Sequence, residues 1–248
     1  MHPITSIALT ATRKASKVIL RAMEELTSRH RNQAEHAEFV TGIESSAYEE
    51  AVASINFSYP NHKIWEPNVK YTHNDYIWYV NPLNGIINYS HHLPHFAVSI
   101  AVQHNKKIKH AIIYDPIRQE IFSATRGEGS YLNNHRIRVS LNKDLNLAIL
   151  NISSIELYKI KNADQILISG SPALDLAYVA AGRIDGFYGN NLNLFDLAAG
   201  TLLIKEAGGL TVDFKGEENH LTTGNIIAGN PKILKAIIKA QSNTKLQN

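Results

Sequence analysis

The chain contains no cysteine among its 248 residues. This absence excludes disulfide bonds, thiol nucleophiles and metal sites held by thiolates, and it fits a reducing compartment. Long hydrophobic runs are also missing, because no apolar stretch approaches the ~20 residues that a membrane-spanning helix needs. Residues 1–11 lack the charged and apolar segments of a secretory signal. We therefore expect a cytoplasmic protein with no membrane partner.

A strong charge of either sign is absent as well. The formal net charge is +3, with 19% charged and 44% hydrophobic residues, which is typical of an ordinary globular protein. A dedicated nucleic-acid-binding protein would show more clustered basic residues. The lysine-rich residues 106–110 form a short run, for which a solvated loop is the ordinary interpretation. A contact with a partner or with RNA is the alternative.

Helical and strand patterns alternate along the whole chain. Apolar residues spaced three and four apart predict helices, and β-branched or aromatic runs between turn residues predict strands. The Asn81-Pro82 dipeptide is expected to end a strand at residue 80. Helices are predicted at 3–26, 45–57, 172–182, 196–207 and 231–240, and strands at 76–80, 96–102, 111–114, 120–125, 163–169, 186–188 and 226–228.

This interleaving without a flexible linker predicts one α/β domain over residues 1–248. Two lobes, at approximately 1–145 and 146–248, are expected within it. The polar residues 105–107 suit a hairpin connection, and Gly127-Glu128-Gly129 suits a hairpin turn better than a phosphate loop.

Three segments carry a more specific signal. Residues 81–88 read Asn-Pro-Leu-Asn-Gly-Ile-Ile-Asn, residues 170–176 read Gly-Ser-Pro-Ala-Leu-Asp-Leu, and residues 196–200 read Asp-Leu-Ala-Ala-Gly. In this order they resemble the inositol monophosphatase family, and specifically its bacterial SuhB-type branch. The resemblance implies a layered αβαβα sandwich of the inositol monophosphatase and sugar phosphatase type, commonly a homodimer. In active members it implies Mg²⁺-dependent hydrolysis of phosphate monoesters.

The first segment departs from the family pattern at the residues that carry the chemistry. The family's loop normally reads Asp-Pro-(Leu or Ile)-Asp-Gly-Thr, and here Asn81, Asn84 and Ile86 replace the two aspartates and the threonine. Magnesium prefers carboxylate oxygens, whereas asparagine offers one neutral carbonyl, and isoleucine has no hydroxyl to orient water. We therefore identify no catalytic residue with assurance at these degenerate positions. The alternative is that both asparagines have only a structural role, as residues of a tight turn.

Two acids are residual candidates for a metal. The family's Glu-Glu pair falls on residues 67–68, so that a slip of the alignment would leave Glu66 as a single ligand. Asp196 stands where the family has a metal-binding aspartate at a helix start, although an aspartate there also serves as an N-cap. Glu38 and Glu44 occupy the positions of further family acids, and whether the four carboxylates converge is open at the level of sequence.

The resemblance also implies where a substrate would lie. Gly85, Gly170 and Ser171 lie in the resembling segments, and they are the candidates for substrate binding. The family's substrate-binding glutamate falls on Gly189, so that one expected polar contact is missing.

Two functions follow from this resemblance. The first is a binding or regulatory protein that has lost Mg²⁺-dependent phosphatase activity and needs no cofactor. It would act in transcription, as in antitermination of ribosomal RNA, with elongation factors or RNA polymerase as partners. The alternative is a weakly active, Mg²⁺-dependent hydrolase of inositol phosphate. A polyol or sugar-phosphate binder without turnover is a third possibility, which the glycine at 189 disfavours.

Overall fold

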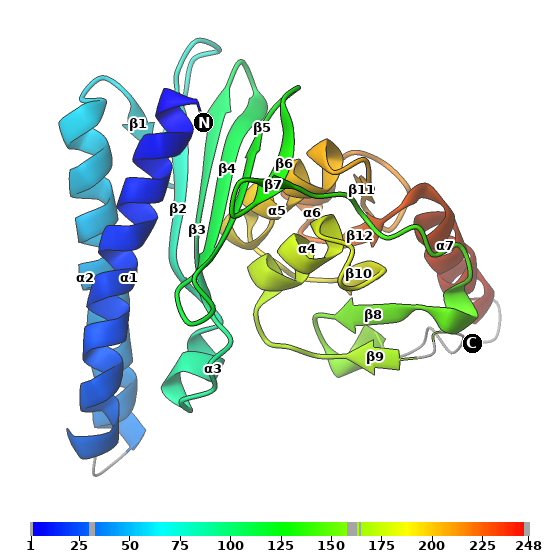
Figure 1. Ribbon diagram of the computed structural model, residues 1–248, viewed down its shortest axis with the longest axis horizontal. Helices are drawn as coiled ribbons and strands as arrows, with labels where there is room; N and C mark the ends of the chain where they lie inside the picture. Colours follow the sequence, from blue (N-terminus) through cyan, green and yellow to red (C-terminus); the bar gives the residue numbers. More distant parts are fainter. Residues whose placement is uncertain (1, 30–32, 158–162, 164, 246–248) are drawn as a thin grey trace.

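The computed structural model describes residues 2–29, 33–157, 163 and 165–245. Five layers follow one another in it (Figure 1): two long helices, a seven-stranded sheet, a pair of helices, a five-stranded sheet and a C-terminal helix. Each layer buries an apolar face against the next. The αβαβα arrangement expected from the family resemblance is confirmed.

The seven-stranded sheet has the order β1-β2-β3-β4-β5-β6-β7. β1 pairs parallel with β2, and the remaining neighbours pair antiparallel. Asn105 and Lys106 form the turn between β3 and β4 with φ of 54° and 57°, which confirms the expected hairpin. The strands are β1 (Lys63–Ile64), β2 (Ile77–Asn84), β3 (Ala97–His104), β4 (Lys107–Asp115), β5 (Glu120–Thr125), β6 (Gly129–Leu132) and β7 (His135–Arg136).

Strand β2 does not end at residue 80 as predicted. It continues through Asn81 and Pro82 to Asn84, and the register with β3 shifts between Asn81 and Asn84. The shift explains why proline is accepted here, because a bulge leaves a residue without a ladder hydrogen bond. The bulge thus lies between the two asparagines, in the last four residues of a strand that is buried throughout.

The five-stranded sheet has the order β11-β12-β10-β8-β9. β8 pairs parallel with β9 and β10, and β12 pairs antiparallel with β10 and β11. The strand predicted at 163–169 is present as the shorter β9, and residue 164 of that prediction lies outside the described residues. The strands are β8 (Ile149–Ile152), β9 (Gln165–Leu167), β10 (Gly186–Gly189), β11 (Leu210–Val212) and β12 (Ile226–Gly229).

The second long helix begins at Gln33, well before the predicted residue 45. Val40, Ile43 and Ala47 are buried at spacings of three and four, so that the apolar stripe continues upstream. None of the helices formed by the described residues is both long and apolar enough to span a membrane. The helices are α1 (Pro3–Arg29), α2 (Gln33–Ser58), α3 (Ile86–Ser90), η1 (Leu145–Leu147), η2 (Ile155–Leu157), α4 (Pro172–Ala180), α5 (Leu194–Glu206), α6 (His220–Thr223) and α7 (Pro231–Lys245).

Helices α4 and α5 form the central layer, and most of their residues are buried. α4 contacts α5 and strands of both sheets, β3 and β4 of the first and β10 and β12 of the second, and α5 contacts β3, β4 and β5 of the first sheet. Gly200 allows the two helices to approach closely, since a Cβ atom there would lie 2.6 Å from Cδ1 of Leu176. The start of α5 therefore lies at a fixed place beside the end of β2.

Candidate functional site

Three side chains meet where β2 ends and α5 begins. The Nδ2 atoms of Asn81 and Asn84 donate hydrogen bonds of 3.1 Å and 2.8 Å to the same carboxylate oxygen, Oδ1 of Asp196. Asn81 is 8% exposed and Asn84 is 2% exposed. The structure thus brings together three of the residues that the sequence selected, from segments that lie more than a hundred residues apart.

The orientation of the Asn84 amide is fixed by its other side. Its Oδ1 atom accepts hydrogen bonds from the Ser171 hydroxyl at 2.8 Å and from the backbone N–H of Ala173 at 3.0 Å. A backbone N–H can only donate, so the amide oxygen must face Ala173. The Nδ2 group must therefore face Asp196. Ser171, a substrate-binding candidate, is fully buried and supports the asparagine from behind.

Asp196 belongs to a capping box at the start of α5. The N-cap is Asn193, whose Oδ1 accepts the N–H of Asp196 at 3.1 Å, while Oδ2 of Asp196 accepts the N–H of Asn193 at 3.2 Å. The interpretation of Asp196 as the N-cap itself is wrong, because the helix begins two residues earlier than predicted. One carboxylate oxygen serves the helix, and the other receives the two asparagine amides.

Burial raises the pKa of Asp196 above its ordinary value, and hydrogen bonds from Asn193, Asn81 and Asn84 oppose the rise. These bonds stabilise the ionised carboxylate, because amide N–H groups donate to it. The three residues form a compact polar cluster in which two neutral donors face one acid.

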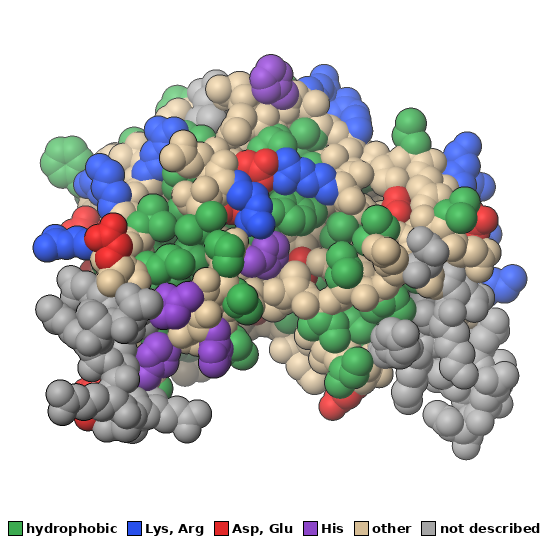
Figure 2. All heavy atoms as spheres, turned by 60° about the horizontal axis from the view of Figure 1, so that its bottom comes forward, with side chains coloured by type: hydrophobic (Ala, Val, Ile, Leu, Met, Phe, Trp, Pro, Cys, Tyr) green, Lys and Arg blue, Asp and Glu red, His purple; other side chains and the backbone are tan. Residues whose placement is uncertain are grey.

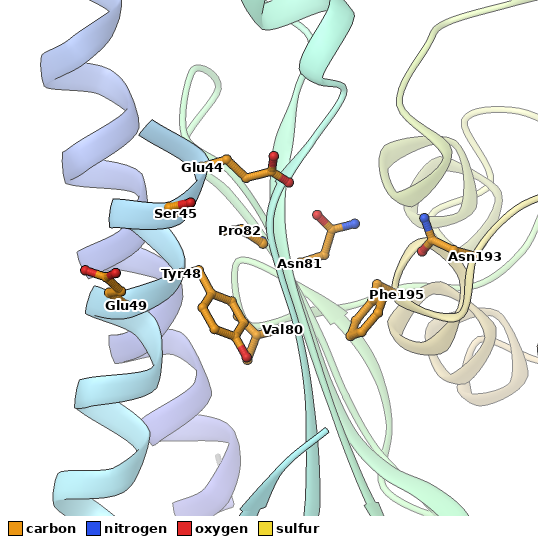
Figure 3. Close-up of a pocket in the computed structure, with 9 residues that line it drawn as sticks. All are labelled: Glu44, Ser45, Tyr48, Glu49, Val80, Asn81, Pro82, Asn193 and Phe195. Carbon is orange, nitrogen blue, oxygen red and sulfur yellow. The ribbon is translucent and has the colours of Figure 1, made fainter. Parts of the chain in front are cut away.

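A cleft of about 410 Å³ opens beside this cluster (Figure 3). Helix α2 provides one wall, β2 provides the floor, and the start of α5 provides the other wall. In Figure 3 the Glu44 side chain extends from α2 toward Asn81, whereas the Glu49 carboxylate points away from the strand. The lining residues are Glu44, Ser45, Tyr48, Glu49, Val80, Asn81, Pro82, Asn193 and Phe195.

The cleft has acidic and amide groups but no basic side chain among the described residues that line it. Burial raises the pKa of the Glu44 carboxyl. Burial also raises the pKa of the Tyr48 phenol, and the nearby charge of Glu66 raises it further by a smaller amount. Such a lining offers hydrogen bonds to neutral hydroxyl groups and attracts cations. It offers a phosphate group no positive partner.

The other two candidate ligands, Glu66 and Glu38, do not line the cleft. Glu66 is exposed and does not line it, and its backbone N–H donates to the Tyr71 hydroxyl at 2.6 Å. Glu38 is exposed on α2. Within the part of the chain that the structure describes, no group of three or more His, Asp or Glu side chains could hold a metal ion.

The remaining candidates lie around the bulge. Gly85 precedes α3 with φ of 96°, and a Cβ atom there would lie 2.9 Å from the His95 carbonyl oxygen, so that only glycine fits. Ile86 is the first residue of α3 and is 37% exposed. Gly170 has φ of 80° and faces the Asn88 amide.

Position 189 has no room for the family's glutamate. A Cβ atom at Gly189 would lie 2.7 Å from atoms of both Leu192 and Phe187. The substitution is therefore built into the packing around β10.

Sequence reasoning missed several residues of the site. Tyr48 and Phe195 line the cleft, and Asn193 caps α5. The Asn-x-x-Asp spacing of residues 193–196 is a capping-box signal that could have been found. The supporting bonds of Ser171 and Ala173 to Asn84 join distant segments, and no local pattern announces them.

The sequence is similar to those of known proteins. The model of the inositol monophosphatase family matches residues 1–246. Proteins called Nus factor SuhB are similar along nearly their whole length: 41% identity for those of Salmonella typhimurium and Escherichia coli, with 96% of this chain and 95% of each relative covered. The corresponding protein of Pseudomonas aeruginosa is 39% identical with the same coverage.

Solved structures give the same result. The extragenic suppressor protein SuhB of Bartonella henselae is 32% identical with a TM-score of 0.87, covering 97% of this chain and all of that one. An inositol monophosphatase from Anabaena is 28% identical with a TM-score of 0.85, covering 97% and 95% of the two chains.

Proposed function

The chain belongs to the inositol monophosphatase family, and from this premise we propose that it is a binding protein of the transcription machinery and not a magnesium-dependent phosphatase. It would work in the cytoplasm as a homodimer, with elongation factors or RNA polymerase as partners. Relatives that are 41% identical are called Nus factors, and this name supports a role in transcription.

One observation carries the loss of activity. The amides of Asn81 and Asn84 both donate to Oδ1 of Asp196, where aspartates at the same two positions would give three converging carboxylates. Two N–H groups therefore occupy the place in which a cation would meet oxygen ligands. Magnesium needs near-octahedral oxygen coordination at about 2.0–2.1 Å. The residues present do not fit it.

Rotation of the Asn84 amide would not rescue the site. The carbonyl oxygen would then leave the Ser171 hydroxyl and the Ala173 N–H, and the latter would be left without an acceptor in the interior. An unsatisfied buried donor costs about 1–3 kcal/mol. The amide is thus held with its donor side toward the acid.

The water molecule that would act as nucleophile also lacks a group to orient it. Ile86 replaces the family's threonine and has no hydroxyl with which to align a water molecule. Groups that act as a unit in catalysis each cost roughly 10²–10⁴ in rate when removed. The combined loss leaves little turnover to expect. A surface that binds transcription proteins needs the fold and not the metal.

The alternative is a weakly active hydrolase of inositol phosphate that uses one Mg²⁺. It is favoured by Glu44, which extends into the cleft toward Asn81 and provides a second carboxylate there. Asp196 and Glu44 would then share the metal.

Hydrolysis of inositol 1-phosphate with Mg²⁺ and with Mn²⁺ separates the two functions. We expect no turnover by the natural protein, and a measurable gain in the triple variant Asn81→Asp, Asn84→Asp, Ile86→Thr. Turnover by the natural protein that Asp196→Asn abolishes would establish the alternative and contradict the proposal.

The transcription role is tested separately with purified elongation complexes. Binding of the natural protein to these complexes is expected, and Asp196→Asn should leave it unchanged because the cleft is not needed. Failure to bind RNA polymerase or any purified elongation factor would reject this part of the proposal.

A further inference from the structure

A second pocket, of about 330 Å³, lies away from the cleft at the other end of the first sheet. It is formed by the β3–β4 hairpin, the end of β5, the second half of α5, strand β11 and helix α6. Helix α5 contacts β4 and β5 on one side and β11 and α6 on the other, and so joins the elements of the pocket. None of its described lining residues lines the cleft beside Asp196.

The charge of this second pocket is opposite to that of the cleft. Lys106, Lys107, Arg126 and Lys205 line it, against a single acid, Glu218. This local excess of three positive charges equals the formal net charge of the entire chain. Positive charges gathered in a concave site attract anions more strongly than the same charges spread over a surface.

The cations are not neutralised within the protein. Lys205 lies 3.9 Å from Glu218, but these side chains are 51% and 80% exposed, so that their attraction is weak. In the described part of the chain, Lys106, Lys107 and Arg126 have no carboxylate partner within 4.0 Å. They are available to a ligand.

The arginine is held in place for such a contact. Nε of Arg126 donates to the Ile108 carbonyl oxygen at 2.7 Å, which fixes the guanidinium beside the hairpin. The two terminal nitrogens of the planar group remain for a ligand, and a guanidinium fork matches phosphate geometry.

The wall of the pocket contains an unused polar atom. His220 is 7% exposed, and its Nε2 lies 3.3 Å from the Thr211 hydroxyl. Nδ1 of His220 is buried and has no hydrogen-bond partner among the residues described. Buried polar atoms without partners are uncommon in proteins. Because this atom is buried, a ligand in the pocket does not reach it, and the case for a ligand rests on the cations.

We propose that this pocket binds a small molecule that carries two or more phosphate groups, such as pyrophosphate or a nucleoside di- or triphosphate. Four cations on three separate elements require an anion with several charged groups. The volume lies within the range of small-molecule sites, about 300–1,000 Å³. The site is independent of the proposed loss of phosphatase activity.

The lining argues against a nucleic-acid strand. Sequence-specific binding of single-stranded RNA relies on stacking against aromatic side chains. Among the described residues that line this pocket there is no Phe, Tyr or Trp.

Calorimetric titration with pyrophosphate, and in parallel with ATP, in metal-free buffer of low salt tests the site. The natural protein should bind one equivalent, and the double variant Lys106→Gln, Lys107→Gln should bind at least about tenfold more weakly. Both lysines are exposed, so that the variant is expected to fold. The matched control Lys143→Gln, Lys232→Gln removes two exposed lysines outside the pocket and should bind normally.

Three results would overturn the proposal. The first is the absence of saturable binding, and the second is an equal loss of affinity in both double variants. The third is abolition of binding by Asn81→Ala, which would place the anion in the cleft. An RNA oligonucleotide that required Lys106 and Lys107 while pyrophosphate and ATP did not bind would assign the pocket to nucleic acid.

Discussion

At the scale of single residues, Asn84 holds the site together by donating from one side and accepting on the other. Its Nδ2 lies 2.8 Å from Oδ1 of Asp196, and its Oδ1 accepts from Ser171 and Ala173. Asn84-Gly85 predicts a tight turn from sequence alone. The second function of the asparagine depends on α4 and α5, which lie far along the chain.

The variant Asn84→Asp should lose stability in the absence of metal. It replaces a buried donor with a second carboxylate beside Asp196, which removes a hydrogen bond to a charged group, worth about 1.5–3 kcal/mol, and adds repulsion. Urea unfolding at pH 8 measures the loss, which should shrink at pH 5 as one of the two acids is protonated.

Asn146→Asp is a matched control for that variant. Nδ2 of Asn146 also donates to an aspartate, Oδ1 of Asp144, at 2.8 Å, but this pair is exposed. Water screens exposed charges, so the control should lose less than about 1 kcal/mol. If both variants lost the same free energy of unfolding, burial of the Asp196 cluster would make no contribution to stability.

Asp175 makes stability depend on pH. It is 1% exposed in α4, and burial raises its pKa to about 7, opposed by hydrogen bonds from Ser169 and Asn151. Because this pKa exceeds the value near 3.9 of an unfolded chain, the group's stabilising contribution is complete below about pH 4. It is lost as pH rises through about 7.

The isosteric variant Asp175→Asn removes this dependence. Between pH 8 and pH 4.5, the melting temperature of the natural protein should therefore rise relative to that of the variant as the pH is lowered. One pKa unit corresponds to about 1.4 kcal/mol. A constant difference between the two proteins over this range would contradict the assignment.

At the scale of elements, α4 and α5 depend on a glycine at their contact. A Cβ atom at Gly200 would lie 2.6 Å from Cδ1 of Leu176 inside the core. Gly200→Ala should therefore destabilise the fold by about 1–3 kcal/mol through overpacking.

Gly42 in α2 has no atom within 4 Å of its Cβ position, so Gly42→Ala should stabilise the fold by about 0.5–1 kcal/mol. Urea unfolding of both variants measures the opposite signs, and stabilisation by Gly200→Ala would refute the close packing.

The longer elements could be predicted from sequence, whereas short strands such as β1, β7 and β11 show no periodicity and were not predicted. Two of the differences at longer elements have clear physical reasons. Apolar periodicity predicts α1, a terminal glycine predicts α4, and a first-turn proline predicts α7. The upstream part of α2 is missed because Thr41 and Gly42 lower the local helix propensity. β2 was shortened because Pro82 usually ends a strand, and a bulge that accepts it depends on pairing with β3. Family resemblance singled out Asn81, Asn84 and Asp196, but their contact was not predicted, since their separation in sequence gives no local signal.

At the scale of the whole molecule, one face carries exposed apolar side chains. Ile87 is 70% exposed, Leu93 is 53% exposed and Ile168 is 50% exposed. The Asn88 amide joins their segments by donating to both the His95 and the Ser169 carbonyl oxygens at 2.8 Å. Figure 2 shows hydrophobic side chains and histidines together on this face. Because family resemblance implies a dimer, we predict that a second copy covers it.

Sedimentation velocity tests this prediction. The natural protein should sediment as a dimer, and Ile87→Asp should shift it toward the monomer, because burying a carboxylate in an interface is costly. Phe57→Asp, which replaces a side chain 92% exposed at the end of α2, should leave the dimer intact. A natural protein that is monomeric at high concentration would disprove the prediction.

The two pockets give the molecule a division of charge. The cleft beside Asp196 is lined by acids and amides, and the second pocket is lined by four cations. An anionic ligand is therefore expected to prefer the second pocket. The proposed function depends on the cleft not binding a metal ion.

Manganese binding measured by electron paramagnetic resonance tests that property most directly, because Mn²⁺ has the same ligand preference as Mg²⁺. The natural protein should show no saturable site, since the amides of Asn81 and Asn84 already occupy the Asp196 carboxylate. The double variant Asn81→Asp, Asn84→Asp should bind one equivalent, and a further Asp196→Asn change should abolish it. One tightly bound Mn²⁺ in the natural protein, lost in Asp196→Asn, would contradict the account and identify a working metal site.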